Sequence, residues 1–318
     1  MGKVLLTKKL GEKSRALLES IPGLELVTVP DARQALFDEH IKDARALLLS
    51  TAYEMPRDVI EKAEKLEVIS RTGAGVDNVD VTAATQRKIL VLNTPLSNSL
   101  SVAEHAVAMI LALSKQLLSY DRELRKGNFK IRRSGECSDL FGKTLGLVGC
   151  GNIGRLTARK CKAAFDMRVI GYDPYVKELD GVTLYEDVEE IFKRADYISL
   201  HLPLTPGTKN LIGAKLLSLM KPTAYIINTS RGGIIHEGEL AEALEKKVIS
   251  GAGLDVFESE PPPGDHPLLG LPNVLLTPHS AALSKECSAR VEYDAVEGIC
   301  DYLKGNTPKF VYNKELPV

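Results

Sequence analysis

The sequence carries no excess of either charge and no long apolar run. Its 318 residues include 41 Lys and Arg against 42 Asp and Glu, which leaves a formal net charge of −1. This balance excludes the strongly basic surface of a nucleic-acid-binding protein. No apolar run is long enough to cross a bilayer, and the N-terminal stretch MGKVLLTKKL is too polar for a signal peptide. We therefore expect neither nucleic acid nor a membrane as a partner.

Cysteine is also scarce, and the few cysteines follow no recognisable pattern. They form neither a C-x-x-C pair nor any other metal-ligand spacing, so no metal site is expected. An odd, scattered set indicates reduced thiols and a cytoplasmic location. The five residues are Cys137, Cys150, Cys161, Cys287 and Cys300.

The length and the order of elements predict two domains. A chain of 318 residues is long for one ordinary domain. Short apolar strands alternate with amphipathic helical stretches from the N-terminus, and a second series of this kind begins at Lys143. The alternation predicts an α/β fold of βαβ units, with parallel sheets covered by helices on both faces. In the first series we expect strands at Val4–Leu6, Glu25–Val29, Ala46–Leu49, Val68–Ile69 and Leu90–Leu92, and helices at Lys13–Ser20, Asp31–Asp43 and Arg57–Lys65.

Three other stretches complete the expected organisation. Asn98–Tyr120 is predicted to form one long buried helix, because its apolar positions are too many for a single stripe. Lys126–Asp139 has the composition of a loop, and Lys285–Leu303 is a charged amphipathic helix that packs back on the first domain.

The segment from Lys143 to Asp173 predicts a dinucleotide site. An apolar strand leads directly into Gly149-Cys150-Gly151-Asn152-Ile153-Gly154, and a helical stretch follows. Gly149 permits a tight turn, Gly151 lets the backbone approach a pyrophosphate, and Gly154 allows the helix to pack close to the strand. Asp173 ends the next strand, where a carboxylate accepts from the ribose hydroxyls and repels a 2′-phosphate. NAD is therefore favoured over NADP.

Polar residues gather where the predicted strands of the second series end. Ligands of open parallel sheets bind beyond the carboxyl ends of the strands. Arg231, Glu260 and His279 each follow a different strand there. Any one of them alone is typical of a loop residue, but three at one edge beside a dinucleotide loop indicate a catalytic site. His201, after another strand, is the alternative acid–base residue. Three other histidines are predicted to lie on the surface: His40, His236 and His266.

These residue types suit the reduction of a 2-keto acid. His279 can protonate the keto oxygen as hydride arrives, and Glu260 can hold its tautomer and stabilise the imidazolium. Arg231 can polarise the carbonyl and anchor a carboxylate. In the first series, Gly73 and Gly75 form a loop whose backbone N–H groups can cradle the substrate carboxylate.

Eight segments carry a resemblance that spans nearly the whole chain. The sequence resembles the D-2-hydroxyacid dehydrogenase family, and within it the D-3-phosphoglycerate dehydrogenase branch. The matching segments are RTGAGVDNVD at 71–80, NTPLSNSLSVAEHA at 93–106, GCGNIG at 149–154, YDP at 172–174, HLPLT at 201–205, INTSRGG at 227–233, GLDVFESEPP at 253–262 and LLTPHSA at 275–281.

The resemblance implies a role for each residue of the site. Arg231, Glu260 and His279 would be catalytic, and the loop of Ala74, Gly75 and Val76 would bind the substrate together with Arg231. The cofactor residues would be Gly149, Gly151, Asn152, Ile153, Gly154, Asp173, His201, Thr229 and Asp255.

The resemblance also implies an architecture. It consists of two flavodoxin-like or Rossmann-like doubly wound domains with the active-site cleft between them. Residues 1–97 with 285–318 would form the substrate-binding domain and residues 98–284 the NAD-binding domain. Homodimers would exchange the long helix near 98–120.

Two departures from the phosphoglycerate dehydrogenase pattern bear on regulation and substrate. The sequence ends at residue 318 without the regulatory extension of many such enzymes, so serine feedback is not expected. Ser50 stands where the branch places an arginine that meets the substrate phosphate. Arg132 and Arg133 are candidates to supply the missing charge.

The sequence therefore predicts an NAD-dependent D-2-hydroxyacid dehydrogenase, similar to phosphoglycerate dehydrogenase, acting on a small 2-hydroxy or 2-keto acid. Hydroxypyruvate or glyoxylate reduction is the alternative reaction. An NAD(H)-sensing protein, similar to the co-repressors built on this fold, is the alternative from another functional class.

Overall fold

The computed structural model describes residues 2–29 and 34–316. The chain divides into two compact units: one contains the residues up to Asn98 and those from Leu283 onward, and the other is Ser99–Ala282. The predicted divisions after residues 97 and 284 lie close to these. Each unit has its own sheet and its own core.

The first unit is built on a five-stranded sheet in the order β2-β1-β3-β4-β5. Every adjacent pair is parallel. This is the flavodoxin-like strand order. Its elements are β1 Gly2–Leu6, α1 Glu12–Glu19, β2 Leu24–Thr28, α2 Gln34–His40, the 3-10 helix η1 Ile41–Asp43, β3 Ala44–Leu49, α3 Arg57–Lys62, β4 Val68–Arg71, α4 Val81–Gln86, β5 Leu90–Leu92 and α11 Lys285–Leu303.

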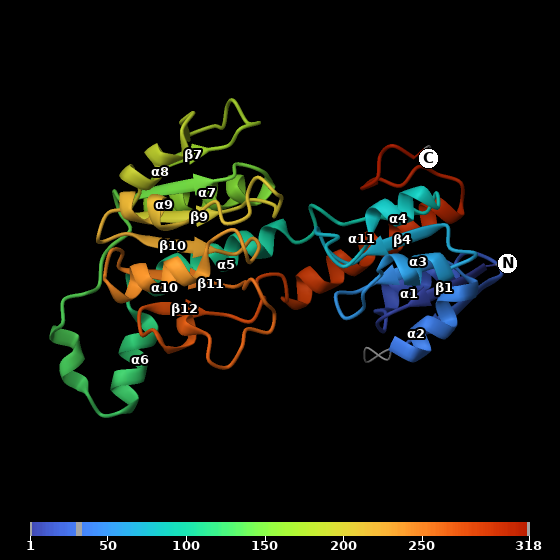
Figure 1. Ribbon diagram of the computed structural model, residues 1–318, viewed down its shortest axis with the longest axis horizontal. Helices are drawn as coiled ribbons and strands as arrows, with labels where there is room; N and C mark the ends of the chain where they lie inside the picture. The colour runs from blue at the N-terminus through green and yellow to red at the C-terminus, as the bar shows by residue number, and fades with distance from the viewer. Residues whose placement is uncertain (1, 30–33, 317–318) are drawn as a thin grey trace. The chain divides into compact units, whose positions relative to one another are not determined.

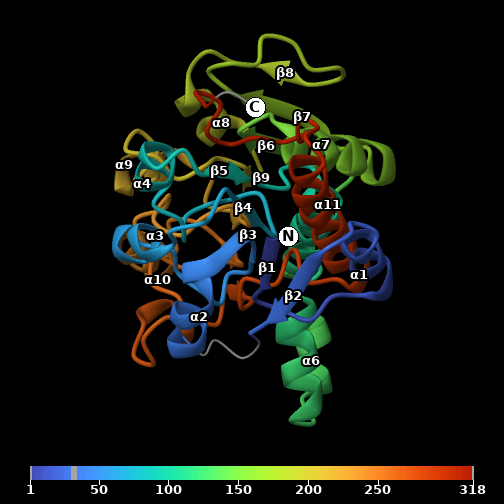
Figure 2. The same ribbon diagram turned by 90° about the vertical axis from the view of Figure 1, so that its right-hand side faces the viewer.

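Two apolar clusters cover the two faces of this sheet. One cluster joins Leu47 and Ile69 of the strands to residues of α2, α3 and α4, among them Phe37 and Ile60. The other joins the alternate strand positions to Leu18 of α1 and to α11. Figure 2 shows α2, α3 and α4 on one side of the strands and α1 and α11 on the other. The unit is therefore doubly wound, and α11 completes it from the far end of the chain.

The second unit contains a seven-stranded sheet in the order β12-β11-β10-β9-β6-β7-β8, again parallel throughout. Counted within the unit, this is the Rossmann order with one further strand. Its elements are α5 Ser99–Ser114, α6 Leu117–Arg125, η2 Phe129–Arg133, β6 Thr144–Val148, α7 Asn152–Phe165, β7 Arg168–Tyr172, β8 Thr183–Leu184, α8 Val188–Arg194, β9 Tyr197–Leu200, α9 Ala214–Leu219, β10 Tyr225–Asn228, α10 Glu237–Glu245, β11 Gly251–Leu254, η3 Pro267–Gly270 and β12 Val274–Leu276.

The helices of the second unit also lie on both faces of their sheet. Residues of α8, α9 and α10 share one apolar cluster with the strands. Met109 and Ile110 of α5 and Cys161 of α7 belong to the cluster on the other face. Most of α5 is apolar because it packs on β10 and β11 and also on α7. The predicted α/β class with two doubly wound parallel sheets is confirmed.

The predicted single helix over Asn98–Tyr120 is wrong. Gln116 adopts a left-handed backbone, with φ 52°, and separates α5 from α6. Its side-chain amide donates to the Leu113 carbonyl and to the Tyr225 hydroxyl, which fixes the break. Neither glycine nor proline marks this position in the sequence.

Other predictions differ from the structure in detail. The stretch predicted as a helix at Asp31–Asp43 forms α2 and η1, while residues 31–33 of that prediction lie outside the described residues. The predicted loop at Lys126–Asp139 contains η2. The predicted helix at Lys285–Leu303 has the same bounds as α11.

The segment from α6 to η2 stands apart from the sheet of its own unit, as Figures 1 and 2 both show. Neither α6 nor η2 contains a buried residue. We call residues 117–133 the arm. Within the described ranges, no helix has the length and hydropathy needed to span a membrane.

Candidate active site

The glycine-rich turn lies between β6 and α7, as the motif predicts. Gly149 has φ +97°, and a Cβ there would stand 2.3 Å from the His201 carbonyl oxygen. A Cβ on Gly154 would stand 2.3 Å from the Gly149 carbonyl oxygen. Both positions therefore require glycine, since any side chain would push β6, α7 and the end of β9 apart.

The space at this turn fits a pyrophosphate. A Cβ added to Gly151 would have no heavy atom within 4 Å, so the backbone is open to an approaching group. Gly151 is the N-cap of α7 and supplies no side-chain cap, which leaves the first N–H groups of the helix available to an anion. Two of the buried side-chain polar atoms that lack a hydrogen-bond partner among the described residues follow strands of this sheet: Thr229 Oγ1 and His201 Nδ1. These features fit the predicted dinucleotide.

Asp173 holds the turn from the end of β7. Its Oδ2 accepts from the Cys150 N–H at 2.8 Å, and its Oδ1 accepts from the N–H groups of Tyr175 and Val176. A carboxylate retains lone pairs beyond three such bonds. A ribose contact is therefore compatible with this geometry. Burial and the nearby Asp173 charge raise the pKa of the Cys150 thiol to about 12, so that thiol is not a nucleophile.

His279 and Glu260 form a direct pair. His279 Nδ1 lies 2.6 Å from Glu260 Oε2, and both side chains are partly exposed. His279 has a left-handed backbone with φ 49°, an uncommon conformation for a residue with a side chain. Its N–H donates to the Asp255 carbonyl at 2.7 Å, which helps to hold that conformation.

The Asp255 carboxylate fixes the segment around His279 by accepting hydrogen bonds from it. It is 1 % exposed. It accepts from Thr277 Oγ1 at 2.6 Å and from the N–H groups of Ser280 and Ala281 at 2.8 and 2.9 Å. His105 of α5 contacts the same group through Thr277 Oγ1 at 3.0 Å. A further contact of Asp255 with nicotinamide stays a prediction.

Arg231 sits in a turn that packs against the segment carrying Glu260. The Asn228 side chain holds this turn by donating to the Arg231 carbonyl, and the guanidinium donates to the Ser230 carbonyl. A Cβ on Gly232 would lie 1.8 Å from the Phe257 carbonyl oxygen. Glycine at this position allows the two backbones to touch.

His201 lies away from the catalytic pair. It follows β9, while His279 follows β12, and β10 and β11 lie between them. Strands about 4.8 Å apart place the two ends roughly 14 Å from one another. Its ring lies beside Gly154 and its Nε2 lies 3.0 Å from Ser199 Oγ. The geometry favours the cofactor role over the acid–base role.

The predicted substrate loop belongs to the first unit and follows β4. Among the described residues, no group accepts a hydrogen bond from the N–H of Ala74, Gly75 or Val76. The Arg71 guanidinium packs over Gly73, where a Cβ would lie 1.5 Å from Nη1. Arg71 was not among the predicted site residues. The only available signal was an arginine directly before the glycine loop.

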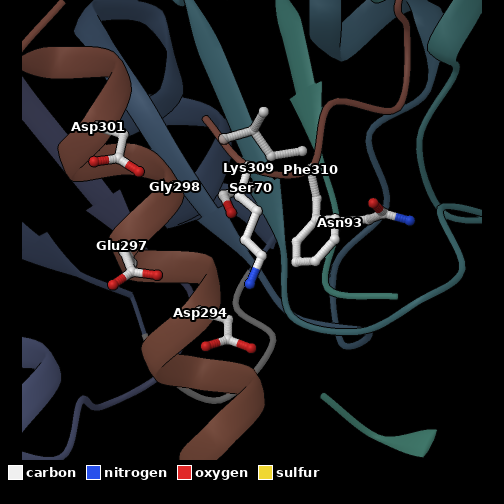
Figure 3. A pocket seen from close by; sticks show the side chains of 9 residues that line it. Ser70, Asn93, Asp294, Glu297, Gly298, Asp301, Lys309 and Phe310 are labelled. Atoms are coloured by element: carbon white, nitrogen blue, oxygen red, sulfur yellow. The ribbon is translucent and has the colours of Figure 1, made fainter. Parts of the chain in front are cut away.

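Two hollows lie near polar groups of the two units. A pocket of the first unit, shown in Figure 3, lies between α11, β5 and the segment with Lys309 and Phe310. Half of its polar side chains are carboxylates of α11, and the Lys309 amino group lies over the Phe310 ring. A second hollow of about 460 Å³ borders Glu260 and His279 and is walled by Phe257, Pro261 and Leu276. Only the second adjoins the candidate catalytic pair.

Comparisons with known proteins agree with this geometry. Residues 107–281 match the model of the D-isomer specific 2-hydroxyacid dehydrogenase, NAD binding domain. The chain belongs to this family. A D-3-phosphoglycerate dehydrogenase of Methanocaldococcus jannaschii is 44% identical over 98% of this chain and 60% of its own length. The chain thus spans less than two thirds of that relative.

Two further relatives are matched over nearly their whole length. A glyoxylate reductase of Korarchaeum cryptofilum is 36% identical and covered over 96% of its length, with 99% of this chain aligned. The solved glyoxylate reductase of Paecilomyes thermophila superimposes with a TM-score of 0.89 at 28% identity, covering 99% of each chain. The predicted family and NAD as the cofactor class are confirmed.

One prediction concerns His201. Burial lowers the pKa of its imidazole to about 4, whereas an unfolded histidine titrates near 6.5. The unfolded state therefore binds more protons between these values, so stability is complete above about pH 6.5 and falls on acidification. We expect wild type to lose about 2 kcal/mol more than His201→Gln between pH 7 and pH 4.5. Urea unfolding at several pH values measures this.

The matched control is His236→Asn, which changes an exposed histidine of the same unit and keeps a capping acceptor for α10. Parallel pH curves for wild type and His201→Gln would contradict the expected contribution of the buried ring.

Proposed function

We propose that this protein is an NAD-dependent oxidoreductase that interconverts a small D-2-hydroxy acid and its 2-keto acid. The observation that carries the proposal is the 2.6 Å contact of His279 Nδ1 with Glu260 Oε2. The pair lies at the same sheet edge as the glycine-rich turn of β6, because all strands of that sheet are parallel. Carboxylate, imidazole and dinucleotide turn at one edge are the parts that such chemistry needs.

His279 is the proton donor and acceptor of this proposal. With Nδ1 engaged by Glu260, Nε2 is the nitrogen that remains for the substrate oxygen. The carboxylate stabilises the ring when it carries a positive charge and fixes which nitrogen faces the substrate. During reduction Nε2–H gives its proton to the C2 oxygen, and in the reverse direction it takes that proton back.

The other predicted site residues would bind the cofactor and the substrate and orient them for the reaction. Gly149, Gly151, Asn152, Ile153 and Gly154 would hold the NAD pyrophosphate, with Asp173 at the ribose and Thr229 and Asp255 toward the nicotinamide. His201 would bind the cofactor beside Gly154. When bound, this cofactor supplies the hydride for C2. Arg231 would bind the substrate carboxylate and polarise the keto group. Ala74, Gly75 and Val76 would add backbone N–H groups to the same carboxylate.

The substrate is the finer part of the proposal. We favour a phosphoglycerate dehydrogenase-like reaction, and glyoxylate or hydroxypyruvate reduction is the second candidate. Ser50 supports the second, because its hydroxyl accepts from Thr7 Oγ1 and from the Ala52 N–H and carries no positive charge for a phosphate. Arg71 beside the 74–76 loop supports the first, since it supplies a cation at that position.

The first test is NADH consumption by purified protein with five 2-keto acids: hydroxypyruvate, glyoxylate, pyruvate, 2-ketoglutarate and 3-phosphohydroxypyruvate. We expect turnover of at least one, and His279→Gln should reduce kcat by at least about 100-fold because it removes the acid–base group. Calorimetry should show unchanged NADH affinity in the variant. Tight NADH binding without turnover of any acid by wild type would instead support an NAD(H)-sensing protein.

A second test separates the sources of charge for a phosphorylated substrate. If Arg71 binds the phosphate, Arg71→Gln should raise the KM for 3-phosphohydroxypyruvate about 10- to 100-fold. This factor corresponds to the loss of a hydrogen bond to a charged group. The KM for glyoxylate should change far less. The comparison variant is Arg132→Ala with Arg133→Ala on η2, where Arg132 stacks over the Phe129 ring. A large KM effect in that variant alone would assign the phosphate to the arm instead.

We also propose that the protein is a homodimer held by the arm. Leu124 and Phe129 are 55% and 64% exposed, and the arm buries no residue in its own unit. An isolated helix as short as α6 is marginal in water, so a surface is expected to cover its apolar face. A second copy is the occupant that the family resemblance implies.

Light scattering of the purified protein tests the dimer. We expect twice the chain mass for wild type and the mass of one chain for Leu124→Ser with Phe129→Ser, because two apolar contacts are lost. Tyr175→Ser, which removes a 91% exposed aromatic residue outside the arm, is the control. A dimer that survives the double change would place the interface elsewhere.

Cytoplasmic residence is part of the same proposal. All five cysteines are unpaired, and four of them are buried, which is compatible with a reducing compartment. Cell fractionation tests this, and a secreted protein would contradict it.

A further inference from the structure

A second histidine–glutamate pair lies in the same unit as the catalytic pair. His266 Nε2 is 2.8 Å from Glu237 Oε2, and the side chains are only 13% and 11% exposed. The prediction that His266 lies on the surface is therefore wrong. Its Nδ1 accepts from the Leu268 N–H, so Nε2 carries the proton and donates to Glu237. Both ring nitrogens are satisfied in the neutral form.

The other carboxylate oxygen of Glu237 accepts a hydrogen bond from the chain segment before Glu260. Glu237 Oε1 accepts from the Glu258 N–H at 2.6 Å. The neighbouring Phe257 ring packs edge-on against His266, with 5.9 Å between the ring centres. Glu237 begins α10, so the segment is fixed to a helix rather than to another loop.

The segment held in this way carries the catalytic carboxylate. Glu260 Oε1 accepts from the Phe257 N–H at 3.0 Å, while Glu260 Oε2 contacts His279. The Phe257 N–H thus orients one oxygen of Glu260, and the other oxygen then meets the imidazole. A shift of the Phe257–Glu258 backbone would move Glu260 relative to His279.

The same backbone supports the turn of Arg231. The close approach of Gly232 to the Phe257 carbonyl leaves no room for an intervening side chain. Glu237 and His266 therefore act on a segment that touches both the acid–base pair and the arginine turn, although neither residue is itself one of the three catalytic candidates.

We propose that Glu237 and His266 are positioning residues for Glu260, and that they set its distance to His279. This inference rests on the proposed dehydrogenase function. Misplacement of a catalytic group by about 1 Å can reduce turnover by about 100-fold. Loss of the pair should therefore lower kcat, while the KM for NADH, which depends on the distant glycine-rich turn, should stay within about twofold of wild type.

The test measures kcat and both KM values for Glu237→Ala, Glu237→Gln and His266→Gln with the best substrate of the panel. We expect Glu237→Ala to lower kcat about tenfold or more. Glu237→Gln should recover much of that loss, since an amide oxygen still accepts from the Glu258 N–H. Thermal midpoints and NADH binding establish that each variant is folded.

Glu239→Ala is the matched control. Glu239 lies in the same first turn of α10, and its carboxylate accepts from the Ala214 N–H at the start of α9 instead of from the 257–260 segment. The control loses the same charge from the same helix end. Its kcat should stay near that of wild type even if its thermal midpoint falls.

A double-mutant cycle with Glu260→Gln decides whether Glu237 acts through Glu260. If it does, Glu237→Ala should add little to the kcat loss of Glu260→Gln, since two residues that act as one unit are not additive. Additive losses, or a Glu239→Ala effect as large as that of Glu237→Ala, would overturn the positioning role while the dehydrogenase stands. A wild type that reduces no acid of the panel would overturn both.

Discussion

The common direction of the seven strands is the constraint on which the candidate site depends. Parallel strands bring every strand-to-helix connection of one kind to the same edge of the sheet. The order β12-β11-β10-β9-β6 then places the ends that carry His279, Glu260, Arg231, His201 and the glycine-rich turn in sequence along that edge. Residues distant in the chain thus become neighbours without any local sequence signal.

A site assembled from the segments that follow several strands needs side chains that hold these segments in place. Two carboxylates do this at the edge, one buried and one with little exposed surface. Asp255 fixes the segment after β12 through three donors, and Glu237 fixes the segment after β11 through Glu258 and His266. Buried polar groups without partners are costly, so the partners of these carboxylates are strongly specified. The unpaired Thr229 Oγ1 and His201 Nδ1 are exceptions at the ligand-facing end.

Much of this arrangement was predictable because it has strong local causes. The order of strand, glycine-rich turn and helix predicted the dinucleotide turn, and the apolar pattern predicted α11 with its observed bounds. Residues at strand ends gave the trio of Arg231, Glu260 and His279. The break at Gln116 was not predictable, because it depends on the Tyr225 hydroxyl of a distant strand. The Glu237–His266 pair was not predictable either, because its members are 29 residues apart and each resembles a surface residue.

Whether a phosphorylated substrate can bind depends on the position of a second positively charged side chain. A 2-keto acid without a phosphate needs one carboxylate anchor, the role proposed for Arg231. A phosphorylated acid brings about two further negative charges, whose burial requires a partner. Ser50 does not supply the positive charge of such a partner, since its side chain is a neutral hydroxyl. Gly73 has φ +149° and bears no Cβ, and only this allows Arg71 to lie across the loop. Under the proposed function, Gly73 would thus place the Arg71 cation beside the substrate-binding loop, and a phosphorylated substrate would depend on this backbone conformation as much as on the arginine.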